Sequence, residues 1–296
     1  MNLDERVAKS PDELPPPATP GEPRPAIEPA AASTGFDADF LGITATMPAT
    51  ASTDAETSVE LDYEHFSVVL DTARRFARVT GVNIDGARLV QVPREDRWEF
   101  DDRVARELQA GPEVYASNDL DRGHLVRRND PVWGEPAEAA RANTETFRFT
   151  NAAPQASGFN QSRELWLGLE DHVLEHARVH DLKLSVFTGP VLADDDPPYR
   201  GIRIPLKFWK IAAWSTGDAL ATTGFVVDQS PLVDVDELPR ALGAPPPLGP
   251  FRTFQVRVAA IAELTGLTMP ELIAAEQLPR GVPGWRALES TADILV

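Results

Sequence analysis

A short segment of the chain, residues 121–134, places a histidine beside a glycine and among arginines. His124 directly follows Arg122 and Gly123, so a basic patch lies within a chain that is acidic overall. Glycine lets the backbone come close to a ligand, and a guanidinium group can bind two phosphate oxygens at once. An imidazole can be neutral near pH 7 and accept a proton there. These residue types together predict hydrolysis of a phosphodiester bond.

The motif Asp121-Arg122-Gly123-His124 is the first of an ordered set. It is followed by Thr150-Asn151-Ala152-Ala153-Pro154-Gln155, by Phe159-Asn160-Gln161 and by Trp166-Leu167-Gly168-Leu169-Glu170. The set resembles the DNA/RNA non-specific endonuclease family, the ββα-metal (His-Me finger) group that includes sugar-non-specific bacterial nucleases and mitochondrial endonuclease G. The resemblance runs over about residues 60–275 and is much more specific than the first motif alone.

The resemblance implies an α+β fold, in which helices flank a central, mostly antiparallel sheet that contains the ββα-metal motif. It also implies an endonuclease that depends on Mg²⁺, with Mn²⁺ as a substitute, and that hydrolyses DNA and RNA with little sequence preference. Attack by water would leave a 5′-phosphate. A homodimer and an inhibitor protein are further partners that the family suggests.

His124 is the expected general base, because an imidazole with a pKa of about 6.5 can take a proton from water above that pH. On that basis, activity is expected to fall as the pH drops through about 6. A histidine in isolation is more often a packed or surface residue, and it is the following motifs that favour catalysis. In the family, the other ring nitrogen of this histidine is held by a backbone carbonyl.

Asn160 is the expected metal ligand, since an amide oxygen is a hard, neutral donor that suits Mg²⁺. The same asparagine could cap the helix that follows, and both roles are compatible. By resemblance, Glu170 would hold metal-bound waters. Asn160 and Glu170 lie farther apart than in the family pattern, so Glu164 is the alternative.

Arg122 is expected to contact the phosphate, because it lies within the motif. Arg97 is carried over from the family's strand that leads toward the active site, with Arg94 as an alternative. A surface salt bridge is the competing explanation for either arginine. Asn151 is expected to orient His124 or a water molecule, although an asparagine that forms a turn is equally compatible.

A rival motif occupies residues 172–176, where His172, Glu175 and His176 satisfy the H-x-x-E-H pattern of zinc metallopeptidases. The pattern is short, and a solvated helix face explains it better. A non-catalytic nucleic-acid-binding module is the other alternative. Phosphate-binding glycine loops and the G-x-S-x-G motif are absent from the sequence.

Charge and composition constrain these hypotheses. The chain has 296 residues, no cysteine and a net charge of −18. That charge opposes tight binding to nucleic acid, but residues 1–60 hold 11 acidic and 3 basic residues and lie outside the proposed catalytic region. Weak, salt-sensitive binding in a local basic groove is therefore expected. No signal peptide of the Sec type and no membrane span is recognisable, which favours the cytoplasm.

The chain is expected to consist of a disordered Pro/Ala-rich leader (1–34), a surface-docking arm with a linker (35–58) and a nuclease domain (59–296). Apolar periodicity predicts a helix over 160–179, and shorter helices are expected over 134–143, 256–265 and 269–274. Branched and aromatic runs predict strands. These strands are 65–70, 77–84, 89–92, 96–101, 146–149, 184–190, 202–205, 208–214 and 221–227.

Overall fold

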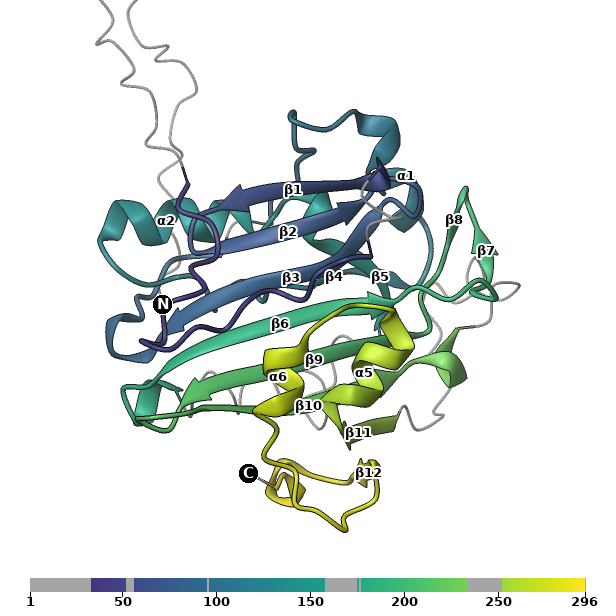
Figure 1. Cartoon of the computed structure of the whole chain (residues 1–296). Helices are drawn as coiled ribbons and strands as arrows, with labels where there is room; N and C mark the ends of the chain where they lie inside the picture. The colour runs from purple at the N-terminus through teal and green to yellow at the C-terminus, as the bar shows by residue number, and fades with distance from the viewer. Residues whose placement is uncertain are drawn as a thin grey trace, which may run out of the picture. The chain divides into compact units, whose positions relative to one another are not determined.

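The computed structural model describes residues 33–51, 56–94, 96–157, 175, 177–233 and 252–295. Within these residues the fold is α+β and is built on an eight-stranded, fully antiparallel sheet in the order β1-β2-β3-β6-β9-β10-β11-β12 (Figure 1). The strands are β1 Ser58–Tyr63, β2 Phe66–Asp71, β3 Phe76–Asp85, β6 Lys183–Val191, β9 Lys207–Ser215, β10 Leu220–Asp228, β11 Arg252–Val256 and β12 Trp285–Leu288.

The central strands are apolar on both faces, because each face is covered by another layer. In β9, Phe208 packs into one core while Trp209 and Ile211 pack into the other. All three side chains are fully buried. Burial on both sides explains why these strands are continuous apolar runs in the sequence, and why they could be predicted.

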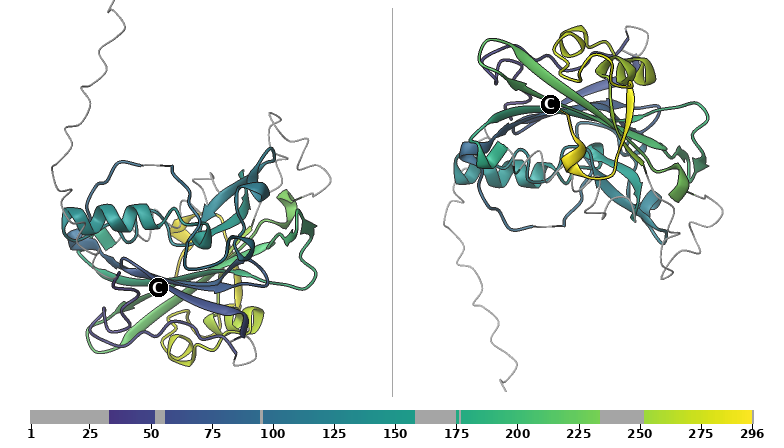
Figure 2. Two further views of the ribbon diagram at one scale, coloured as in Figure 1. Left: turned by 90° about the horizontal axis from the view of Figure 1, so that it is seen from above. Right: turned by 90° about the horizontal axis from the view of Figure 1, so that it is seen from below.

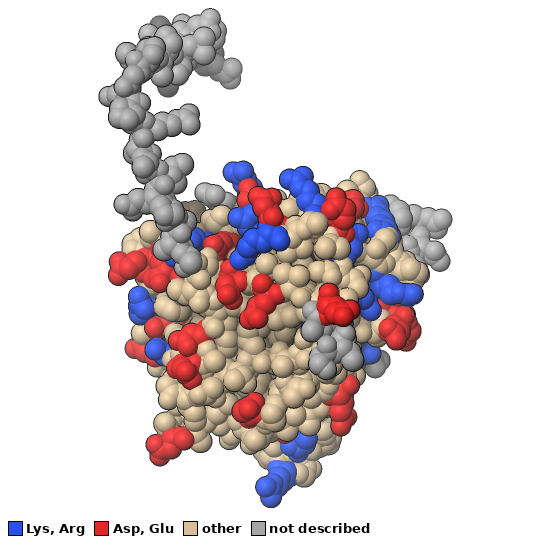
Figure 3. Space-filling view, turned by 45° about the horizontal axis from the view of Figure 1, so that its top comes forward, with Lys and Arg blue, Asp and Glu red and all other residues tan. Residues whose placement is uncertain are grey.

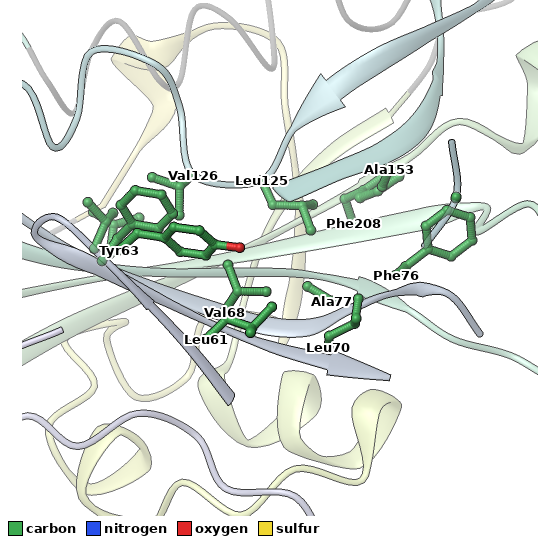
Figure 4. Close-up of a cluster of buried hydrophobic side chains, with 14 of the residues drawn as sticks. Leu61, Tyr63, Val68, Leu70, Phe76, Ala77, Leu125, Val126, Ala153 and Phe208 are labelled. Atoms are coloured by element: carbon green, nitrogen blue, oxygen red, sulfur yellow. The ribbon is translucent and has the colours of Figure 1, made fainter. Parts of the chain in front are cut away.

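One face of the sheet carries a small hairpin made of β4 (Leu120–His124) and β5 (Ala152–Ala156). The helices α1 (Pro112–Tyr115) and α2 (Pro136–Glu145) belong to the same layer, which Figure 2 shows on one side of the sheet. Figure 4 shows Leu125, Val126 and Ala153 of this layer facing side chains of β1–β3. The hairpin is therefore held by the core of the sheet.

The opposite face is covered by α5 (Val258–Thr265), α6 (Pro270–Ala274) and residues 35–47 (Figure 2). Gly266 caps the C-terminus of α5, and its φ of 68° is in the left-handed region that favours glycine. Pro270 is the first residue of α6, where its missing N–H costs nothing. In the 35–47 segment, the Phe36 ring packs against Phe187 at a centroid distance of 5.2 Å, tilted by 60°, and the Phe36 backbone N–H donates to Ser67 Oγ.

The remaining regular elements are short. The two-residue strands β7 (Pro198–Tyr199) and β8 (Ile202–Arg203) pair with each other. Turns of 3₁₀ helix occur at Gly86–Arg88, Arg106–Leu108, Phe149–Asn151, Ser230–Leu232 and Thr291–Asp293. In the described ranges, none of the helices is both long enough and apolar enough to cross a bilayer.

The prediction that 89–92 continues the sheet is wrong. Leu89 forms only an isolated bridge with Trp133, and Val90 N–H donates to the carbonyl of Val132. β3 already has β2 on one side and β6 on the other, so no open edge remains for the segment that follows it.

Two further predicted strands are also wrong. The segment 96–101 makes one parallel bridge, between Glu99 and Arg148. The segment 146–149 lies between α2, which extends to Glu145, and the 3₁₀ turn that begins at Phe149, so it forms a turn and one isolated bridge. Instead of a ladder, Phe149 N–H donates to the carbonyl of Glu99 and Glu99 N–H donates to that of Phe147.

Several boundaries also differ from the expectation. Val256 ends β11 and α5 begins two residues later, since Val256 pairs with Gly224 of β10. The helix expected over 160–179 lies outside the described residues except for Glu175 and 177–179, which are helical.

Candidate active site

His124 is the last residue of β4, and its backbone is fixed by the neighbouring Asn151. The Asn151 side chain is fully buried and accepts a hydrogen bond from Val126 N–H at 2.8 Å. It donates to the carbonyls of Val126 at 2.9 Å and Thr146 at 3.0 Å. Asn151 thus holds the chain immediately after His124 and joins it to the end of α2.

Two aromatic rings enclose the His124 imidazole. Trp98 lies at a centroid distance of 4.6 Å with the rings tilted by 49°, and Phe147 lies edge-on at 5.0 Å. The Arg122 guanidinium is 5.7 Å from the Trp98 ring centroid, in cation–π range. The rings pack against the partly buried imidazole and restrict its orientation.

The segment 94–99 presents alternate side chains to His124. Arg94 and Asp96 form an ion pair at 2.8 Å, and both charges act on the imidazole. Trp98, two positions further, contacts it directly. Arg97 instead pairs with Glu99 at 2.8 Å, and its side chain is 82% exposed. This alternation is typical of an extended segment, and it brings Arg94 rather than Arg97 to the imidazole.

Arg128 completes the basic surroundings. Its Nη1 donates to the carbonyl of Val92 at 3.0 Å and to Asn143 Oδ1 at 2.9 Å. The segment 89–92 therefore anchors an arginine of the DRGH region, although it does not join the sheet. Arg122, in contrast, is exposed and available to a ligand.

The electrostatic surroundings keep His124 neutral at pH 7. Burial is the main effect that lowers the pKa of His124, to about 3. The positive charges of Arg94, Arg128 and Arg122 lower this pKa further, and Asp96 opposes them. The pH at which activity is expected to fall on acidification is consequently lower than 6.

Two polar side chains at the hairpin have buried atoms without a hydrogen-bond partner in the described part of the chain. These atoms are Nε2 of His124 and both amide atoms of Gln155. A Cβ on Gly123 would come within 2.1 Å of the Gln155 amide, so glycine is needed for this approach. Buried polar groups are usually paired, so these atoms fit a site that a substrate phosphate, water or ion completes.

A cleft of about 900 Å³ adjoins the hairpin and is lined in part by Arg127, Arg128 and Arg178. Its volume lies in the range of small-molecule sites. On the face shown in Figure 3, basic and acidic side chains are mixed near the upper edge. The described residues of that face form no continuous basic surface. Arg94, Arg122 and Arg128 act on His124 and form a basic cluster suited to a phosphate.

Sequence reasoning missed Trp98 and assigned Gln155 no role. Trp98 is 26 positions from His124, and no local pattern joins the two. Gln155 belongs to a motif that was recognised, but only its burial beside Gly123 indicates a function.

The predicted metal ligand Asn160 lies outside the described residues, as do Glu170 and its alternative Glu164. His172 and His176 of the peptidase-like pattern also lie outside them. Glu175 of that pattern is exposed and pairs with Arg178 at 2.5 Å on the helix surface. That contact is what a solvated helix face predicts.

Curated proteins include two relatives of the chain. It is 40% identical over 280 residues to the uncharacterized protein y4fB of Sinorhizobium fredii, a match that covers 88% of this chain and 42% of y4fB. It is 25% identical over 166 residues to nuclease C1 of Cunninghamella echinulata var. echinulata, which covers 52% of this chain and 58% of that protein. The chain thus spans about two fifths of the first relative and just over half of the second.

A solved structure supports the fold. The crystal structure of the EndoG/EndoGI complex matches with a TM-score of 0.51 and 18% identity, over 71% of this chain and 84% of that one. The family model described as DNA/RNA non-specific endonuclease matches residues 45–276. That range includes the β4–β5 hairpin and the central strands of the sheet, so the chain belongs to the DNA/RNA non-specific endonuclease family.

Proposed function

We propose that the protein is a Mg²⁺-dependent endonuclease that hydrolyses DNA and RNA with little sequence preference. The observation that carries this proposal is the imidazole of His124, whose Nε2 is buried without a partner in the described structure and lies among arginines. A neutral imidazole in a basic setting can accept a proton beside a bound phosphate. Contacts to the backbone and not to bases would make the enzyme indifferent to sequence.

His124 removes a proton from the attacking water, and the phosphate binds Arg122 and Arg94 through charge-assisted hydrogen bonds. Asn151 acts through the backbone of Val126 and keeps the imidazole in place. The aromatic rings of Trp98 and Phe147 limit the positions that the imidazole can adopt.

Asn160 would hold the Mg²⁺ ion, with Glu170 or Glu164 binding its waters. The amide of Gln155 is unpartnered among the described residues as well, but it packs against Gly123 on the face of the hairpin opposite His124, so it is given no role in holding the ion. When bound, Mg²⁺ supplies positive charge that neutralises the scissile phosphate and the departing 3′ oxygen.

The family suggests two protein partners. The matched solved structure describes the inhibition of EndoG within an EndoG/EndoGI complex. On this likeness an inhibitor protein is a proposed partner of this chain, whereas a homodimer is proposed from the family resemblance alone.

Incubation of supercoiled plasmid and of a structured RNA with the full chain and Mg²⁺ tests the proposal. Both substrates should be degraded, Mn²⁺ should substitute for Mg²⁺, and EDTA should stop the reaction. A binding module would shift the plasmid in a gel without cutting it. A zinc peptidase would instead degrade casein, and would lose that activity on His172→Ala or His176→Ala. Either of these results would overturn the endonuclease assignment.

A pair of arginine variants tests the arrangement around His124. Arg94→Gln removes a positive charge that lowers the pKa of His124, so this pKa should rise and the acid limb of kcat/KM should move to higher pH. Arg97→Gln should leave the limb unchanged, because Arg97 pairs with Glu99. The pH profiles are measured on a short fluorescent oligonucleotide at saturating Mg²⁺. If the acid limb shifts in Arg97→Gln and not in Arg94→Gln, then Arg97 and not Arg94 is the arginine that acts on His124.

A further inference from the structure

A second cluster of ligating side chains lies between the β1–β2 turn and α2. It consists of Glu64 and His65 in the turn and Glu138 in the first turn of the helix. The side chains of Glu64 and His65 are 0% and 4% exposed, and that of Glu138 is 27% exposed. Their three ligand atoms lie within 4.8 Å of one another. Figure 1 shows α2 beside the strands β1 and β2 that carry this turn.

The separations match those of a metal site. His65 Nε2 is 3.4 Å from Glu64 Oε1 and 3.2 Å from Glu138 Oε1. Nitrogen and oxygen ligands about 2.0–2.1 Å from a tetrahedral Zn²⁺ ion are about 3.3–3.4 Å apart. The distances from His65 Nε2 to the two carboxylate oxygens therefore match two edges of a tetrahedral set of ligands.

The surroundings of His65 favour the tautomer that a metal requires. Its Nδ1 lies 2.8 Å from the carbonyl oxygen of Pro131, which can only accept, so Nδ1 carries a proton. In the neutral imidazole, the lone pair is then on Nε2 and faces the two carboxylates. The ring stacks on Trp133 at a centroid distance of 3.5 Å with an interplanar angle of 8°. A carbonyl that orients a ligating histidine in this way is typical of metal sites.

The carboxylates are also oriented. The second oxygen of Glu64, Oε2, accepts from the guanidinium of Arg141, and Thr34 Oγ1 donates to Oε1 at 3.2 Å. The second oxygen of Glu138 accepts from Glu135 N–H at 2.9 Å, as part of the capping box of α2. Each carboxylate thus has one oxygen held by a donor and the other facing His65, and in Glu64 that second oxygen also accepts from Thr34.

The backbone at this turn is held in an unusual conformation. His65 has a φ of 66°, which is uncommon for a residue other than glycine. Its carbonyl accepts from Asn83 N–H at 3.0 Å, so the conformation is fixed by β3. The strained turn brings adjacent residues, Glu64 and His65, to the same point, which a regular strand would not do.

We propose that Glu64, His65 and Glu138 form a structural site for a divalent transition-metal ion of the Zn²⁺ class. The carboxylates of Glu138 and of Glu64, which also pairs with Arg141, supply oxygen ligands, and the imidazole supplies the nitrogen ligand that such ions prefer over Mg²⁺. The site joins the β1–β2 turn to α2, and α2 leads directly into residues 146–151, which hold His124. The inference is independent of the proposed nuclease reaction.

The test uses the full chain with His172→Ala and His176→Ala, so that the H-x-x-E-H pattern cannot compete. ZnCl₂ is titrated in excess Mg²⁺, and heat release and the thermal unfolding midpoint are measured. We expect one Zn²⁺ per chain and a rise of roughly 5–10 °C in the midpoint at 100 times the Kd. Absence of stoichiometric binding would overturn the proposal and would leave the cluster as a hydrogen-bonded link between the β1–β2 turn and α2.

Glu138→Gln removes a ligand charge yet retains an oxygen that can complete the capping box. It should weaken Zn²⁺ binding at least 100-fold and abolish the thermal shift, whereas the matched variant Glu135→Gln should bind as the parent does. Unchanged binding by Glu138→Gln would contradict the assignment. Should that variant not fold, the absorption spectrum of Co²⁺ bound to the parent decides: intense visible bands indicate a tetrahedral site, and weak bands contradict it.

Discussion

Replacement of His124 by alanine is expected to slow plasmid cleavage by roughly 10²–10⁴-fold, because general-base catalysis contributes about that much. The arginines and the metal ligand remain, so binding of the substrate should persist. Initial rates on supercoiled plasmid and on a short oligonucleotide measure the loss. The unfolding midpoint, followed by circular dichroism, should stay near that of the unsubstituted chain.

His180→Ala is the matched control, since His180 is an exposed histidine near the end of the 177–180 helical turn. It should retain full activity. A loss of less than about tenfold in His124→Ala would show that another group accepts the proton.

Asn151→Ala is expected to have the largest effect on stability. It removes the partner of Val126 N–H and of the carbonyls of Val126 and Thr146, all in a buried place. Unsatisfied buried groups cost about 1–3 kcal/mol each, so the free energy of unfolding should fall by roughly 3–5 kcal/mol. The midpoint should then drop by roughly 6–20 °C. Asn151→Asp should be worse, because it replaces an amide donor with an oxygen that faces two carbonyls.

The partly exposed Asn129 provides the control, and Asn129→Ala should change the midpoint little. Cleavage by Asn151→Ala is measured well below its midpoint, so that the chain stays folded. A reduced kcat under that condition supports a positioning role for Asn151. A variant with unchanged stability would show that its hydrogen bonds are replaced by water.

The sheet could be predicted where the sequence carries its own signal. The strands β2, β3, β6, β9 and β10 are runs of branched and aromatic residues, and the antiparallel α+β fold is confirmed. β4 and β5 could not be predicted in this way, because Asp121, Gly123 and Pro154 are poor strand formers. Their pairing depends on burial against the sheet, as at Leu120 and Ala153, which no local pattern reveals.

The candidate site was predictable only through its motifs. They indicated His124, Arg122 and Asn151 together, and the structure brings all three to one hairpin end. The roles of these residues in catalysis stay predictions. Contacts between distant segments could not be predicted from the sequence. Examples are the contact of Trp98 with His124 and that of His65 with Glu138, which is 73 positions away. Such contacts follow from how the sheet brings its loops together, not from spacing along the chain.

The pairing of β3 with β6 places Ile84 opposite Leu184, and the residues that form β4 and β5 lie between these two positions in the sequence. During synthesis on the ribosome, β3 therefore emerges long before its partner. An unpaired strand edge can associate with other chains, so the nascent polypeptide carries an aggregation-prone edge until β6 appears.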